Sequence, residues 1–149
     1  MATNWTDVDP QSFLAQVKNH KRRRDAETLL GLMERVTGQR PRMFGPSIVG
    51  FGEYHYRYDS GHSGFGPAAS FAPRSTAIVV YLPDGLAAHQ ADLADLGPHQ
   101  EGTGCLYLKD LAQVNLNALE RIIASSYQDL TAGTFGSRAA DGSRAAEQR

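Results

Sequence analysis

The stretch that decides the fold is Met43-Phe44-Gly45-Pro46-Ser47-Ile48-Val49-Gly50-Phe51-Gly52-Glu53-Tyr54-His55-Tyr56-Arg57-Tyr58. Gly45-Pro46 predicts a turn, and the β-branched and aromatic residues that follow predict a strand over 48–58. Gly50 and Gly52 allow either a bulge or a close approach to the backbone that a side chain would block. We therefore expect another part of the molecule, or a ligand, to lie against this backbone.

Alternation along the end of this stretch divides its side chains into two sets. Tyr54, Tyr56 and Tyr58 are predicted to share one face of the strand, and Glu53, His55 and Arg57 the other. One interpretation is an ordinary antiparallel strand with a half-buried aromatic face and a solvated polar face. The functional alternative is that the tyrosine rings wall a cleft while His55 and Arg57 point toward a polar ligand.

Helices and further strands are predicted on both sides of this stretch. Asp9-Pro10 is a helix start signal, and apolar stripes at spacings of three and four predict helices over 10–19, 24–37, 86–96 and from 115 to about 130. Further strands are predicted at 68–71, 76–82 and 105–108. The pattern predicts one α+β domain over 1–131, in which an antiparallel sheet packs against N- and C-terminal helices. Residues 132–149 are rich in small and charged residues, which predicts a flexible tail.

Composition excludes several classes of partner. The 149 residues carry a formal charge of −1 and are 41% hydrophobic, which gives no global reason to expect nucleic acid or an acidic membrane. A basic run over 18–24 is interpreted as a solvated junction between two helices. The start of the chain has no secretory pattern, no apolar run is long enough to span a membrane, and Cys105 is the single cysteine. These features predict a cytoplasmic protein.

Three further motifs carry a family resemblance. They are Ser70-Phe71-Ala72-Pro73-Arg74, Leu96-Gly97-Pro98-His99 and Cys105-Leu106-Tyr107-Leu108-Lys109. Together with the opening stretch they resemble the YdhG-like family, a bacterial domain of unknown function whose members are sometimes described as frataxin-like iron chaperones. The resemblance implies helices packed on an antiparallel sheet. Ser75, Gln100 and Thr103 stand where the family usually has lysines, so an anion is expected to bind this chain more weakly than it binds such relatives.

The favoured function is a non-enzymatic module that binds a small anionic ligand or a protein partner. The candidate ligand-binding residues are Ser47, His55, Arg74, His99 and Lys109, with Tyr54, Tyr56, Arg57 and Cys105 as secondary candidates. Arg74 offers a rigid fork of donors to an anionic group, and His99 can change charge near neutral pH. No catalytic residue, resident cofactor or metal ligand is predicted.

Three alternatives stay open. A frataxin-like iron-binding role would use exposed carboxylates such as Asp92 and Asp95, because hard cations prefer oxygen ligands. An enzyme would use Cys105 as a nucleophile or His99 as its base. Self-association into a homodimer would use the tyrosines and Phe51 as an exposed patch.

Overall fold

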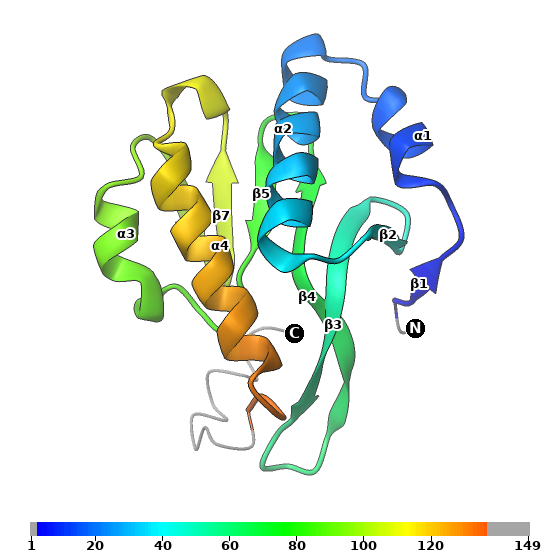
Figure 1. Cartoon of the computed structure of the whole chain (residues 1–149), viewed down its shortest axis with the longest axis vertical. Coiled ribbons are helices and arrows are strands. Elements are labelled where there is room, and N and C mark those ends of the chain that lie inside the picture. The colour runs from blue at the N-terminus through cyan, green and yellow to red at the C-terminus, as the bar shows by residue number, and fades with distance from the viewer. Residues whose placement is uncertain (1–2, 137–149) are drawn as a thin grey trace.

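A single antiparallel sheet with helices on one side forms the scaffold of the computed structural model, which describes residues 3–136 (Figure 1). Its seven strands are β1 (Trp5–Thr6), β2 (Pro41–Phe44), β3 (Ile48–Arg57), β4 (Ser63–Pro73), β5 (Ile78–Tyr81), β6 (Gln100–Gly102) and β7 (Cys105–Leu108). Their order across the sheet is β1-β2-β3-β4-β5-β7-β6, so only the last two depart from the order of the chain. Every strand pair is antiparallel, which confirms the predicted α+β class.

All but the shortest of the described helices begin where a side chain caps the first amides. They are α1 (Pro10–Ala15), α2 (His20–Thr37), α3 (Gln90–Ala94) and α4 (Leu116–Thr131), with short 3₁₀ turns at Ala87–His89 and Leu111–Gln113. Asn19 caps α2 and Asn115 caps α4, because each side-chain oxygen accepts an early backbone amide. Gly38 ends α2 in the left-handed conformation, at φ 70°. No helix within residues 3–136 is both long enough and apolar enough to cross a membrane.

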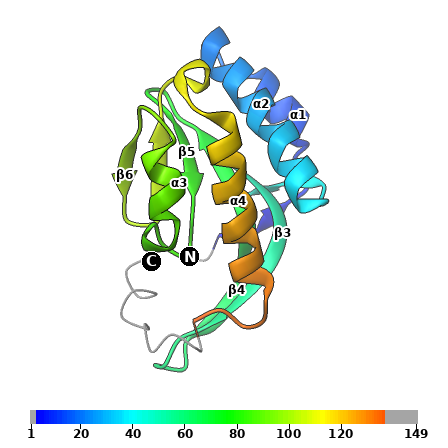
Figure 2. The ribbon, with the colours of Figure 1, turned by 60° about the vertical axis from the view of Figure 1, so that its left-hand side comes forward.

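The core lies between the sheet and its two long helices. Helices α2 and α4 both contact β3 and β4, and Figure 2 shows α2, α3 and α4 on the same side of the sheet. The largest fully buried side chains include Phe51, Phe71, Ile78, Leu106 and Leu119. Burying such side chains stabilises the fold by about 1.5–3 kcal/mol each, which explains why the amphipathic stripes of the sequence reveal the two long helices.

Several predicted boundaries are wrong, and each has a local cause. The first helix ends at Ala15 rather than at 19, and α2 begins at His20 rather than near 24, because Asn19 caps the second helix. The basic run is therefore mostly the start of α2 and not a junction. The predicted helix over 86–96 consists of a 3₁₀ turn and the short α3. The strand predicted over 68–71 begins earlier, at Ser63, and so includes most of the glycine-rich segment 61–66.

Parts of this same chain lie against the backbone of Gly50 and Gly52. Pairing of β3 with β4 runs without a slip from Val49↔Phe71 to Arg57↔Ser63, so the glycines make no bulge. A Cβ on Gly50 would lie 2.9 Å from Pro67 and from the Trp5 ring. Gly52 has φ +71° and faces the ring of Tyr127 on α4. The predicted close approach is correct, and it is made by these side chains.

The segment after α4 returns to the sheet. The amide of Phe135 donates to His55 O at 2.9 Å, and Arg57 donates its amide to Phe135 O at 3.0 Å. Phe135 is 4% exposed and its ring packs edge-on against Tyr54. Residues 132–136 are therefore part of the domain, which corrects the predicted start of the tail at 132. The rest of that tail lies outside the described residues.

Candidate functional site

Arg22 joins two distant segments at one end of the sheet. Its side chain is buried, with the residue 7% exposed. Its Nε donates to the backbone oxygen of Arg74 at 3.2 Å, and its Nη1 donates to the backbone oxygen of Lys109 at 2.8 Å. The first turn of α2 thus fixes the β4–β5 turn relative to the end of β7.

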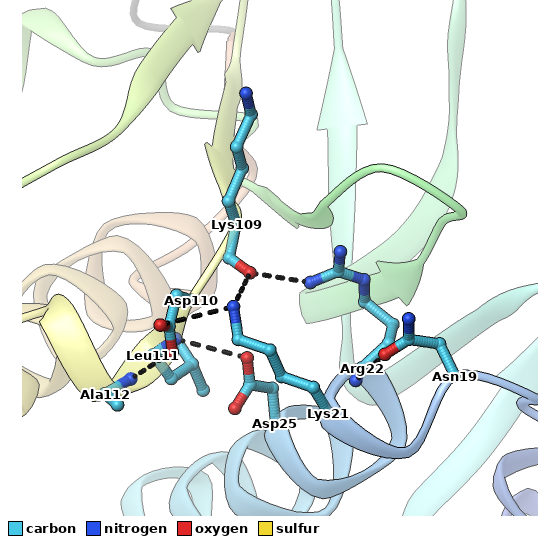
Figure 3. Close-up of polar contacts among 8 residues, drawn as sticks. All are labelled: Asn19, Lys21, Arg22, Asp25, Lys109, Asp110, Leu111 and Ala112. Carbon is cyan, nitrogen blue, oxygen red and sulfur yellow. Dashed lines mark hydrogen bonds and ion pairs between the residues drawn. The ribbon is translucent and has the colours of Figure 1, made fainter.

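The two acids near Arg22, Asp25 and Asp110, contact other groups. Lys21 pairs with Asp110 at 3.2 Å and also donates to Lys109 O at 3.1 Å (Figure 3). The amide of Ala112 and the charge of Lys21 hold the pKa of Asp110 below its usual range. Asp25 accepts the amide of Leu111 at 3.1 Å. No ion pair joins Arg22 to a carboxylate within residues 3–136, so hydrogen bonds to carbonyls position its charge without neutralising it.

A cationic cleft of about 460 Å³ lies beside Arg22, between α1, the start of α2 and the β4–β5 turn. Its lining residues are Phe13, Gln16, Val17, Lys18, Asn19, Arg22, Ser47, Pro73, Arg74 and Ser75. Three of these side chains are cations and none is an acid. One guanidinium nitrogen of Arg74, Nη2, donates to the Tyr81 hydroxyl at 3.0 Å, which anchors that side chain. The cleft is large enough for a small metabolite and has the charge to select an anion.

The first amides of α2 add to the positive potential of this cleft. Asn19 lines the cleft and accepts the amide of Arg22 at 2.8 Å, while its backbone oxygen accepts the amide of Arg23. The amides of His20 and Lys21 have no acceptor in the described part of the chain. Free amides and the helix dipole favour an anion at such an end. The first turn of α2 contains basic side chains and no acidic one. Positive charge is unfavourable at the start of a helix, where the helix dipole is also positive, and a bound anion would compensate it.

A second cleft, of about 450 Å³, lies on the other side of the β4–β5 turn and holds His99 and Lys109. His99 Nδ1 contacts Gly97 O, and Nε2 contacts a Glu101 carboxylate oxygen, both at 2.8 Å. Both partners are acceptors, so the two bonds form together only when both ring nitrogens carry protons. Burial acts to lower the pKa of His99, but these two bonds outweigh it and raise that pKa. The Lys109 side chain points away from Lys21 and Arg22 (Figure 3).

The predicted ligand-binding residues therefore divide into three places. Ser47 and Arg74 line the cationic cleft, and His99 and Lys109 line the second cleft. His55 lines neither, because it lies on the long β3–β4 hairpin, where its ring packs against Phe65 and contacts the hydroxyl of Thr134 from the segment after α4. Arg22 links the backbones of Arg74 and Lys109, so the two clefts flank one hydrogen-bonded junction.

Among the secondary candidates, the tyrosines lie together as predicted. Tyr54 and Tyr56 have ring centroids 5.8 Å apart, and Tyr56 stacks on Tyr58 at 5.2 Å. Tyr54 and Tyr56 line an open depression of about 790 Å³ that also contains Trp5. His55 and Arg57 do not line it. The tyrosines therefore form one wall of a depression, but the two polar side chains that were expected to face a ligand there do not.

The enzymatic alternative receives no geometric support from Cys105. Burial raises the pKa of its thiol, against the opposite effects of a hydrogen bond with Tyr107 and the charge of Arg74. A raised pKa reduces the fraction of reactive thiolate at neutral pH. His99, the proposed base, makes its hydrogen bonds to Gly97 and Glu101. Of the carboxylates considered for iron, Asp92 pairs with Arg121 at 2.9 Å.

Sequence reasoning missed Lys18 and Arg22 as cleft residues because it treated the basic run as solvated. A usable signal was present. Asn19 is a good helix cap, and a cap followed at once by His20, Lys21 and Arg22 places positive charge at the positive end of a helix dipole. That conflict between local charge and helix polarity points to a bound anion more directly than does net charge. In comparisons with known proteins, no family model, no curated protein and no solved structure matches this chain.

Proposed function

We propose that this protein is a non-enzymatic binding module for a small anionic ligand, bound in the cationic cleft. The ligand would carry a phosphate or carboxylate group, since the guanidinium fork and free backbone amides suit both. Lys18 and Arg74 provide charge at the mouth of the cleft, and Ser47 provides a hydroxyl. The resemblance to the YdhG-like family supports no more specific ligand.

One observation carries this proposal, namely the buried charge of Arg22. A buried charge is costly unless it is paired and hydrogen-bonded. The side chain of Arg22 makes two bonds to carbonyl oxygens, and its Nη2 atom has no partner within residues 3–136. The side chain also lines a cleft that contains two other cations and no acid. An anion in this cleft would supply the missing negative charge and accept the remaining donors.

Two of the positions at which the YdhG-like family usually has a lysine, Ser75 and Thr103, provide a direct test. Ser75 is exposed and lines the cationic cleft, whereas Thr103 is exposed and lines neither of the two clefts. Ser75→Lys should tighten the binding of inorganic phosphate by about two- to fivefold, the equivalent of an exposed ion pair worth about 0.5–1 kcal/mol. Isothermal titration with phosphate at constant ionic strength measures this change.

Thr103→Lys is the matched control, because it adds the same charge at a distance from the cleft. Its phosphate affinity should equal that of the unmodified chain. Equal tightening by both variants would assign the effect to net charge and overturn the proposed site. Failure of the unmodified chain and Ser75→Lys to bind phosphate or a small dicarboxylate such as succinate would overturn the proposed function itself.

A further inference from the structure

A buried polar cluster lies beyond the end of β5, whereas the cationic cleft lies at the turn that precedes β5. Asp84 follows β5, His89 ends the 3₁₀ turn at Ala87–His89, and Ser126 and Asp129 project from α4. Asp84 is 6% exposed and His89 is 3% exposed. His89 Nε2 lies 2.8 Å from Asp84 Oδ2, and the Ser126 hydroxyl donates to Asp84 Oδ1 at 2.6 Å. Three separate segments of the chain thus meet at one carboxylate.

The order of these contacts excludes one familiar interpretation. In a Ser-His-Asp triad the imidazole lies between the hydroxyl and the carboxylate. Here the carboxylate of Asp84 lies between Ser126 and His89, so the Ser126 hydroxyl donates to a carboxylate and not to the imidazole. The cluster is therefore arranged around negative charge rather than around a nucleophile.

The ligand atoms of the cluster converge at the spacing of a metal site. One atom each from Asp84, His89 and Asp129 lies within 4.8 Å of the other two. In a tetrahedral site with bonds of about 2.0 Å, neighbouring ligand atoms lie roughly 3.3 Å apart. The His89–Asp84 contact of 2.8 Å would therefore need to widen by only about 0.5 Å.

Charge and helix polarity favour a cation at this place. With both carboxyl groups ionised, the two carboxylates and one imidazole carry a net negative charge even when the imidazole is protonated, whereas a divalent ion bound to the neutral imidazole balances both carboxylates. Asp129 lies in the last turn of α4, which contains no basic residue. The partial negative charge of a helix C-terminus makes this an unfavourable position for an acid. A metal ion would compensate both effects.

We propose that Asp84, His89 and Asp129 bind one divalent transition-metal ion. An imidazole nitrogen with two carboxylate oxygens suits borderline ions such as Zn²⁺ and Mn²⁺. Ser126 would orient the Asp84 carboxylate by holding Oδ1, which leaves Oδ2 for the ion. Asp129 is only partly buried, so it gives the ion a way in. This site is separate from the cationic cleft and does not depend on the proposed anion-binding function.

Metal titration of the full chain tests the proposal. After chelator treatment and dialysis, calorimetric titration with Mn²⁺, and separately with Zn²⁺, should show one ion bound per chain. Asp129→Asn should weaken binding by at least about tenfold, because even residues that only orient metal ligands contribute that much. Because Asp129 is partly exposed, replacing it should disturb the fold less than replacing the buried Asp84 or His89. Circular dichroism checks that the variant is folded.

Asp7→Asn is the matched control, since Asp7 is exposed and precedes α1, outside the cluster. It should bind the ion as the unmodified chain does. In the unmodified chain, substoichiometric Mn²⁺ should broaden the amide resonances of His89 and Ser126 first. No saturation at one ion per chain, unchanged binding in Asp129→Asn, or broadening centred elsewhere would each overturn the proposal.

Discussion

The two ends of β5 carry opposite charge: hydrogen bonds to carbonyl oxygens hold the charge of Arg22 without neutralising it, whereas a histidine partly compensates the charge of Asp84. Before the start of β5, Arg22 joins the β4–β5 turn to β7 through backbone carbonyls. Beyond the end of β5, Asp84 contacts His89 in the 3₁₀ turn and Ser126 on α4. The cationic cleft contains no acid, whereas the cluster around Asp84 contains two.

This difference shows how one contact can position the chain and also leave charge for a ligand. Arg22 satisfies carbonyl oxygens of two segments, which fixes their separation but supplies no negative charge. Asp84 accepts two donors, one of them a histidine, and so its end of the sheet is partly compensated. We therefore expect the acidic end to contribute more to folding stability and the basic end to contribute more to binding.

Removing Asp84 should have the largest effect on stability. Asp84→Ala leaves His89 and Ser126 buried without their acceptor, and breaking a buried charge pair costs about 3–5 kcal/mol of unfolding free energy. Urea unfolding of the metal-free chain measures it. Asp92→Ala removes an exposed ion pair and should cost less than about 1 kcal/mol. Similar losses in the two variants would contradict the comparison.

Removing Arg22 should have an intermediate effect on stability and a strong effect on anion binding. Arg22→Met loses two charge-assisted bonds to carbonyl oxygens, each worth about 1.5–3 kcal/mol of unfolding free energy, but it also removes a buried charge, which offsets part of that loss. Stabilisation of the chain by phosphate should disappear, which thermal unfolding with and without phosphate measures. Arg121→Met, which removes an exposed arginine on α4, should leave the phosphate response intact. A retained phosphate response in Arg22→Met would remove the main support for the cleft.

The smallest effect is expected from His99, and it depends on pH. Its pKa is raised in the folded protein, so its contribution to stability is complete below its ordinary pKa of 6.5. That contribution is lost as pH rises through the folded pKa. The difference in unfolding free energy between the unmodified chain and His99→Gln should therefore shrink from pH 6 toward alkaline pH. A difference that grows with pH would contradict the doubly protonated ring.

The fold was largely predictable because local signals agreed with burial. The stripe that includes Leu119 and Ile122 located α4, a continuous run of β-branched residues located β5, and the short apolar run over 105–108 located β7. The short edge strands β1 and β6 lacked such signals, since two or three residues bury too little apolar surface to show a pattern. Phe135 was missed for a related reason: one aromatic residue in a polar segment does not reveal that it packs on β3.

The site was predictable only in part, because its members meet through tertiary contacts. Arg74 and Ser47 share a cleft, and His99 and Lys109 share another, but no sequence spacing revealed the division. His55 was assigned with them from the polarity of its strand face, which says nothing about how far the β3–β4 hairpin extends from the clefts. Asp84, His89 and Asp129 are separated by up to 45 residues, so their convergence follows only from the packing of α4.

The most direct test of the cationic cleft is an NMR titration of the isotope-labelled chain with inorganic phosphate. We expect saturable shifts of the His20 and Lys21 amides, of the Arg22 side-chain Nε resonance and of residues in the β4–β5 turn. Shifts should be small around His55 and on α4. No saturable shift at the start of α2, or shifts centred on His99 and Lys109 instead, would contradict it.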